Sequence, residues 1–431
     1  MINARRWAVL FAFGIVATSS PAWAEMNLKD SDRIVFFGDA SMSRSTFSFA
    51  LEQFLRVRYP ELKANIISLG KRRSTSEDGN QRLALEVLPL KPTCVVLCFG
   101  LEDGQNKAFD DALLDKYVAE MSKMMDTISE AGAQTIVLTP PPPEESRRQS
   151  LSFANYDDVV AEYAKAVTDL AAERKVPVLD WYGAVKKHRE ELGNAARQQM
   201  TEHGIVPSGL SVAIATDLLL THWQADPFEF LITVDWKTGT VEASTGTASM
   251  LKRTDASVVL GLADIPVPPV MFDRGFAPEA AWPMCKWCGY KLKIANLPAG
   301  GAIISDDKGE NAKPFLLEQL VSGADLSTIG PLASHETTAA LMSLIGMKLR
   351  QVQKYGTVCR QEMPYPEFAE AYALFREAER ALALAYHQVV LGTPTTLKTT
   401  VRIESVTKAE ATPKKPPPKK AIKRAKRKPK P

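Results

Sequence analysis

The fold of this chain is decided by residues 34–41, which read IVFFGDAS. A hydrophobic run that ends in Gly-Asp predicts a buried parallel strand followed by a tight turn into a helix. Residues after such a turn lie beyond the carboxyl edge of the sheet, where proteins of this class bind their ligands. Position 40 should therefore face a functional site, and Ala40 places there only a methyl group, which cannot act as a nucleophile.

The hydrophobic pattern of the next 150 residues repeats the same unit. Short apolar runs typical of strands alternate with segments of helical spacing, and this rhythm predicts an α/β fold with a five-stranded parallel sheet and helices on both faces. The predicted strands lie near residues 33–37, 64–69, 93–99, 134–139 and 176–180.

Two of these strands end in motifs that resemble those of the SGNH/GDSL hydrolases, a family of serine esterases and lipases. In the family's first motif the nucleophile is the Ser of Gly-Asp-Ser, and the matching position here is Ala40. Residues 66–70, IISLG, match the second motif, so Gly70 corresponds to the glycine whose backbone N–H helps to hold the oxyanion. The resemblance implies a flavodoxin-like, three-layer α/β/α fold.

The third motif is altered at its amide. The family has Gly-x-Asn-Asp after a buried strand, whereas residues 100–103 read GLED and place Glu102 where Asn belongs. An amide donates a hydrogen bond to the developing negative oxygen, while an ionised carboxylate only accepts one and repels the oxygen.

The last motif, Asp-x-x-His-Pro, has lost its base. Residues 202–208 read EHGIVPS, and Pro207 sets the alignment. Val206 then stands where the general base His belongs, and His203 stands where Asp belongs. Val206 cannot accept a proton. The resemblance thus implies an ester hydrolase by family, with all four catalytic identities substituted.

Two interpretations of function follow from these substitutions. The first is an exported, catalytically inactive pseudohydrolase that binds a glycan or an acylated envelope component, or serves as a scaffold. The alternative is an active esterase on carbohydrate or lipid esters in which Ser41 replaces the nucleophile and His203 serves as its base. No cofactor is indicated, and Glu102, Asp103 and His203 would supply only three unproven metal ligands.

The composition divides the chain into four parts. Residues 1–24 have the Arg pair, short apolar stretch and Ala-Trp-Ala site of a signal peptide, and no later segment is long and apolar enough to span a membrane. Residues 25–225 form the hydrolase-like domain and 226–395 a smaller β-then-α extension. Residues 396–431 are predicted to be a disordered, Lys/Pro-rich tail. Signal cleavage near Ala24 would place the protein in the periplasm, in the cell envelope or outside the cell.

Charge is distributed unevenly along the chain. From Lys408 to Pro431 eleven Lys or Arg residues face one acid, a net charge of +10, whereas the rest of the mature chain has 40 basic and 49 acidic residues. Such a tail favours adhesion to a polyanion or simple solvation. A sequence-specific nucleic-acid partner is not indicated, because no aromatic residue interrupts the charges. A second basic run, residues 71–73, follows Gly70 and could pair with Glu102, form an anion site or be solvated.

Five cysteines in an exported chain raise the question of disulfides. Cys94 and Cys98 share one predicted strand and are interpreted as small core residues. Cys285 and Cys288 form a C-x-x-C motif, for which we favour a structural disulfide, in one arrangement with Cys359. A redox pair or half of a zinc site is the other interpretation, but no second motif supplies the remaining zinc ligands.

Overall fold

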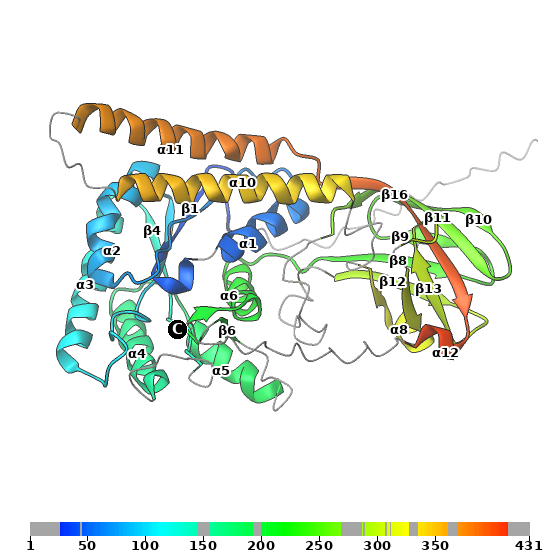
Figure 1. The fold of residues 1–431 in the computed structure, drawn as a ribbon, viewed down its shortest axis with the longest axis horizontal. Coiled ribbons are helices and arrows are strands. Elements are labelled where there is room, and N and C mark those ends of the chain that lie inside the picture. The colour runs from blue at the N-terminus through cyan, green and yellow to red at the C-terminus, as the bar shows by residue number, and fades with distance from the viewer. Residues whose placement is uncertain are drawn as a thin grey trace, which may run out of the picture.

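The computed structural model describes residues 26–412, except 44, 145–154, 193–199, 203, 269–286, 288, 307, 311, 327–334 and 361–368. Figure 1 shows an α/β front domain and a β-rich domain, joined along one side by two long helices. The expected signal peptide and most of the basic tail lie outside the described residues. No helix within the described residues is long and apolar enough to cross a membrane.

The front domain is built on a five-stranded parallel sheet, as the sequence predicted. In spatial order its strands are β2 (Asn65–Ser68), β1 (Arg33–Gly38), β3 (Cys94–Cys98), β4 (Gln134–Leu138) and β5 (Val178–Leu179). Because β1 and β3 are central, every residue of β3 is buried, and so is all of β1 after Arg33. This topology confirms the flavodoxin-like fold class.

Alternate residues of β1 feed two separate cores on opposite faces of the sheet. Ile34 and Phe36 pack into one apolar cluster, whereas Val35 and Phe37 pack into the other. The first face is covered by α1 (Ser45–Arg58), α5 (Trp181–Leu192) and α6 (Gly209–His222). The second is covered by α2 (Ser76–Arg82), π-helix η2 (Leu83–Val87), 3-10 helix η3 (Leu88–Leu90), α3 (Asp111–Glu130) and α4 (Tyr156–Glu173).

The β-rich domain consists of two sheets around a third apolar cluster. One sheet has the order β10 (Thr247–Arg253), β11 (Ser257–Pro266), β16 (Thr396–Val406), β13 (Gly301–Ser305) and β14 (Lys313–Leu316). The other has the order β15 (Ala324–Asp325), β12 (Gly289–Ala295), β8 (Glu229–Asp235) and β9 (Val241–Ala243). Short α8 (Leu317–Ser322) and α12 (Lys408–Ala411) lie at the end of this domain (Figure 1).

The predicted start of the disordered tail at residue 396 is wrong. Residues 396–406 form β16, the central strand of the first sheet, paired with β11 on one side and β13 on the other. Leu397, Val401 and Ile403 are buried in the domain core. The alternation of apolar and polar residues in this segment is that of a half-buried strand, and the Lys/Pro-rich composition of the residues after it obscured the pattern.

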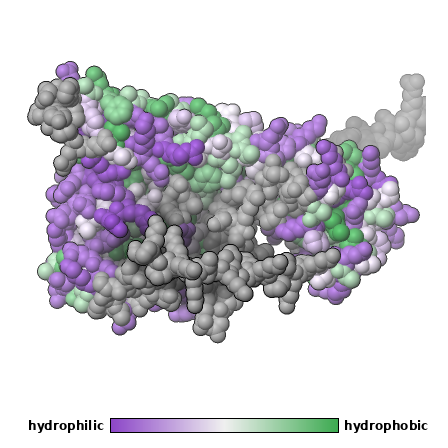
Figure 2. All heavy atoms as spheres, viewed as in Figure 1, coloured by the Kyte–Doolittle hydropathy of each residue, from purple (hydrophilic) through white to green (hydrophobic). Residues whose placement is uncertain are grey.

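A helical hairpin connects the two domains. In it α10 (Glu336–Cys359) and α11 (Ala369–Leu391) pack side by side. The first half of α10 packs into the core of the β-rich domain through Leu341 and Ile345, and its second half packs into the front domain through Val352 and Tyr355. Figure 2 shows hydrophobic side chains along the outer surface of this hairpin, where Leu374 is 67% exposed.

A buried ionic cluster fastens the hairpin to the front domain. The Lys348 ammonium of α10 lies 2.6 Å from the Glu52 carboxylate of α1, and their side chains are 0% and 1% exposed. Lys348 also donates to Nδ1 of His387 in α11 at 3.3 Å, while Nε2 of His387 donates to the Lys63 carbonyl at 3.0 Å. Burial alone would raise the pKa of Glu52, but Lys348 and His387 bring it below its usual value.

Candidate functional site

The turn after β1 is held by Asp39, which is fully buried. One carboxylate oxygen accepts the backbone N–H of Ser41 at 2.8 Å, and the other accepts the N–H of Leu101 at 3.0 Å. Asp39 therefore ties the turn after β1 to the turn after β3. Residues 40–42 form the short 3-10 helix η1, for which Asp39 is the N-cap.

Gly70 lies where two backbones approach too closely for a side chain. A Cβ atom at this position would be 2.0 Å from the carbonyl carbon of Met42 and 2.1 Å from its oxygen. The next residue, Lys71, donates its backbone N–H to the Gly38 carbonyl at 3.0 Å. The structure thus brings Gly70 against the turn that carries Ala40, at the carboxyl edge of the sheet.

The turn after β3 carries Glu102 and Asp103 with very different surroundings. Asp103 is buried, accepts the backbone N–H groups of Ser76 and Gly100 at 2.8 and 3.0 Å, and accepts the Ser76 hydroxyl at 2.5 Å. Glu102 is only half-buried and accepts the backbone N–H of Arg73 at 3.2 Å. No ion pair joins Glu102 to the described side chains of residues 71–73. The hydrogen bonds of Asp103 give it a structural role, whereas the Glu102 carboxylate is more accessible to solvent.

Ala40 and Val206 belong to one apolar cluster, together with Leu101. Ala40 is 1% exposed, and Val206, in β7 (Val206–Pro207), is 2% exposed. The positions that correspond to a nucleophile and a general base are therefore filled by hydrophobic packing. His203, the third altered position, lies outside the described residues.

Ser41, the alternative nucleophile, is 2% exposed. Its hydroxyl oxygen is buried and makes no hydrogen bond to another described atom. Ser43, two residues further along, is half-buried and donates its hydroxyl proton to the Ala40 carbonyl at 2.8 Å. The acid beside Ser41 is Asp39, whose two carboxylate oxygens already accept the backbone N–H groups of Ser41 and Leu101.

The two buried acids have raised pKa values. Burial raises the pKa of Asp39 to about 8, against the lowering effect of the Ser41 N–H, and the negative charges of Glu102 and Asp103 add to the rise. Burial likewise raises the pKa of Asp103 to about 6, although the Ser76 hydrogen bonds oppose it. Both groups are enclosed by the turns that they hold together, so their perturbed titration does not mark them as catalytic acids.

The cysteine and metal predictions have separate outcomes. Cys94 and Cys98 are free and buried in the sheet, which confirms the interpretation as core residues. Cys359 is a free, buried thiol at the end of α10, so the predicted arrangement in which it forms a disulfide is wrong. Cys285 and Cys288 lie outside the described residues. Within the described part of the chain no three His, Cys, Asp or Glu side chains gather as a metal site.

The sequence interpretation missed the roles of Asp39, Asp103 and α10. Asp39 directly follows Gly38, the last residue of β1, and Asp103 lies three residues after Gly100, just beyond β3. These positions after a glycine were the available signal for their capping role. The C-terminal turn of α10 lies beside Gly70 and helps to line a pocket of about 280 Å³ there. No sequence signal pointed to this contact, because α10 is far from Gly70 along the chain.

Comparisons with known proteins agree with the fold. Residues 36–198 match the model of the GDSL-like lipase/acylhydrolase family. A gut microbial diltiazem-metabolizing enzyme has a similar structure with a TM-score of 0.65 at 13% identity, over 89% of this chain and 100% of that chain. An acetylxylan esterase from Geobacillus stearothermophilus gives a TM-score of 0.40 at 19% identity, over 46% of this chain and 96% of its own. No curated protein matches the chain.

Proposed function

We propose that this protein is a non-catalytic member of the SGNH/GDSL hydrolase superfamily that binds an envelope component, because residues 36–198 match the GDSL-like lipase/acylhydrolase model but lack that family's catalytic side chains. The observation that carries the proposal is the apolar packing of Ala40 against the cluster that contains Val206. A methyl group and an isopropyl group cannot replace a nucleophile and a base. What the fold retains is a sheet edge with a pocket beside Gly70.

The electrostatics at this edge also oppose ester hydrolysis. Glu102 stands where the family's amide would donate to the oxyanion, and its carboxylate can only accept hydrogen bonds when ionised. Loss of a single oxyanion donor costs about 10²–10³ in kcat in a serine hydrolase. Combined with the loss of nucleophile and base, this change leaves no route to efficient turnover.

The proposed ligand is a glycan or an acylated envelope component, the class of molecule that the family's esterases cleave. Residues 1–24 have the pattern of a secretory signal, and this supports a role outside the cytoplasm. The basic residues after Lys408 support attachment to a polyanion such as an envelope polysaccharide or an anionic lipid surface. The alternative esterase, with Ser41 as nucleophile, is disfavoured by the burial of that hydroxyl.

The test is hydrolysis of p-nitrophenyl acetate by the purified mature protein, beside its Ser41→Ala variant. We expect no turnover above the buffer rate from either protein. Turnover by the wild type that Ser41→Ala abolishes would overturn the proposal and establish a displaced nucleophile. Circular dichroism of both proteins controls for folding, so that a silent variant is not mistaken for an unfolded one.

A second arm of the experiment restores the family residues at Ala40, Glu102, His203 and Val206 as Ser, Asn, Asp and His. Gain of turnover by a folded restored variant would show that the sheet edge can still support the chemistry and that the wild type lacks only the side chains. If the wild type were already as active as this variant, the non-catalytic assignment would be wrong.

A further inference from the structure

A pocket lies between the front domain and the end of α10. The loop after β2 forms one wall, and the last two turns of α10 form the other. Its volume of about 280 Å³ is near the lower end of ligand pockets and suits one small group rather than a long chain. Among the described residues that correspond to the family's motifs, only the retained Gly70 borders it, so this pocket adjoins the degenerate site without coinciding with it.

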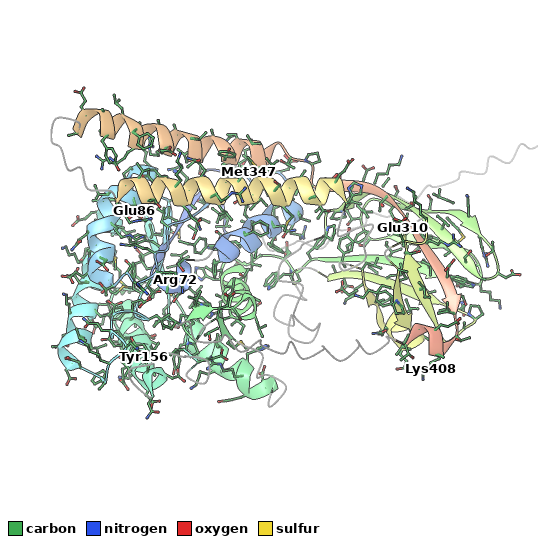
Figure 3. All side chains as sticks on the ribbon, viewed as in Figure 1. Arg72, Glu86, Tyr156, Glu310, Met347 and Lys408 are labelled. Carbon is green, nitrogen blue, oxygen red and sulfur yellow. The ribbon has the colours of Figure 1, made fainter. Side chains whose placement is uncertain are left out.

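The charges around this pocket are all of one sign. Lys71, Arg72 and Arg360 line it, and no acidic residue does. Lys71 is half-buried and Arg72 is exposed, and within the described chain neither forms an ion pair. Figure 3 places Arg72 beneath α10. Such a concentration of positive charge is unexpected, because the mature chain before Lys408 has more acidic than basic residues, 49 against 40.

Arg360 is held in place by a buried acid. Its guanidinium lies 2.9 Å from Glu86, whose side chain is 0% exposed, while its own side chain is 25% exposed. Glu86 also accepts from Arg82 at 2.9 Å, so two guanidinium groups share one carboxylate. Figure 3 shows Glu86 near the C-terminal end of α10. The shared partner leaves excess positive charge, and the remaining N–H groups of Arg360 are oriented by a rigid neighbour.

The serine hydroxyls of the pocket do not compete for this role. Ser43 donates its proton to the Ala40 carbonyl at 2.8 Å, and Ser68 donates to the Met42 carbonyl at 3.3 Å. The donors left for a ligand are therefore mainly cationic. Lys71 and Arg72 lack an ion-pair partner among the described residues, and Arg360 shares Glu86 with Arg82. Arginine and lysine side chains of this kind bind carboxylate or phosphate oxygens.

We propose that this pocket binds an oxyanion, a carboxylate or a phosphate, carried on a single saccharide unit. Lys71 and Arg72 supply the charge that is free to pair, and Arg360 supplies a fixed guanidinium on the opposite wall. The inference rests on the binding role proposed above and names the chemistry of the ligand. It also explains why the hairpin reaches over the sheet edge, since α10 contributes one wall of the pocket.

The test is isothermal titration of the mature protein with glucuronate and with glucose 1-phosphate, using glucose as the neutral control. At least one of the two anionic sugars should bind, and glucose should not. The anionic sugar with the higher affinity identifies the preferred group as carboxylate or phosphate. In Lys71→Gln/Arg72→Gln, affinity should fall at least about 10-fold, because charge-assisted hydrogen bonds are lost. Higher salt should weaken binding by the wild type, since the site is open to solvent.

Arg73→Gln is the matched control. It is compared with the single variant Arg72→Gln, because each removes one guanidinium from the same exposed loop, but Arg73 does not line the pocket. Its affinity should stay within about 2-fold of the wild type. Equal losses in Arg73→Gln and Arg72→Gln would overturn the inference in favour of general surface attraction, and so would failure of both anionic sugars to bind or equal binding of glucose.

The two proposals fail in different ways. If the ester assay shows turnover but the anion titration still depends on Lys71 and Arg72, the non-catalytic assignment is wrong and the anion pocket stands. If the ester assay is silent and the anionic sugars do not bind, only the anion pocket is wrong.

Discussion

Replacing Lys348 by Met tests the buried ionic cluster that fastens the hairpin to the front domain. The change keeps a side chain of similar length but leaves the Glu52 carboxylate, 1% exposed, without its ammonium partner. An unpaired buried charge is far more costly than a missing surface contact. We therefore expect Lys348→Met to be among the most destabilising single substitutions in α10.

The magnitude follows from the geometry. Two unit charges 2.6 Å apart attract by about 6 kcal/mol at an effective dielectric constant of about 20. Desolvation of both ions offsets much of this attraction, and loss of one partner from a buried pair typically costs about 3–5 kcal/mol. In the double variant Glu52→Leu/Lys348→Met no unpaired carboxylate remains. A coupling energy of about 3 kcal/mol between the two sites is expected from the double-mutant cycle.

The assay is equilibrium unfolding in urea, followed by circular dichroism. Lys116→Met is the matched control, because Lys116 lies at the same 2.6 Å from Glu77 while both side chains are about half exposed. This control should lose far less stability than Lys348→Met, because an exposed ion pair contributes little. If Lys348→Met loses no more than the control, or if the coupling energy is below about 1 kcal/mol, the reasoning that the cluster fastens the hairpin is refuted.

Three further predictions concern β16, Gly70 and Asp39. A chain ending at residue 395 should fail to form a folded β-rich domain, while one ending at 412 should melt within about 2 °C of the full mature chain, as measured by calorimetry; equal melting of both would contradict the central place of β16. Gly70→Ala should destabilise by about 3 kcal/mol in urea unfolding because its Cβ would overlap the Met42 backbone, whereas Gly346→Ala, whose Cβ is 3.6 Å from the nearest atom, should be neutral or stabilising by up to about 1 kcal/mol. Burial raises the pKa of the Asp39 carboxyl to about 8 in the folded protein, against about 4 for an exposed Asp, so the folded state binds the extra proton and stability should fall as pH rises from about 4 to 8. Asp39→Asn should flatten this slope in unfolding measured at several pH values, and a parallel slope would rule out Asp39 as its source.

The front sheet was predictable because its signals are local. Each strand is a compact apolar run that ends in a glycine or a turn, and β1 and β3 are buried on both faces. Ser208 likewise caps the N-terminus of α6 by accepting the backbone N–H of Ser211, a role that depends only on residues next to it in the sequence. The location of residue 40 in the turn after β1 could likewise be inferred from Gly38 and Asp39 alone.

The features that escaped prediction depend on distant parts of the chain. The pocket needs Arg72 and Arg360 on its two walls, and nothing in either segment specifies the other. Glu86 is paired with Arg82 of α2 and with Arg360 at the end of α10, and Arg360 is 274 residues away in the sequence. Composition also misled at residues 396–406, because the Lys/Pro-rich end dominated a window that begins with a strand.

The central place of β16 has a consequence for the order in which the protein can fold. No strand joins the hairpin of β10 and β11 to the hairpin of β13 and β14 until residues 396–406 of β16 have been made. The front domain, by contrast, has all five strands of its parallel sheet within residues 33–179. During synthesis the front sheet can therefore form early. The β-rich domain can complete its first sheet only when nearly the whole polypeptide has been made, and until then each hairpin has an unpaired strand edge.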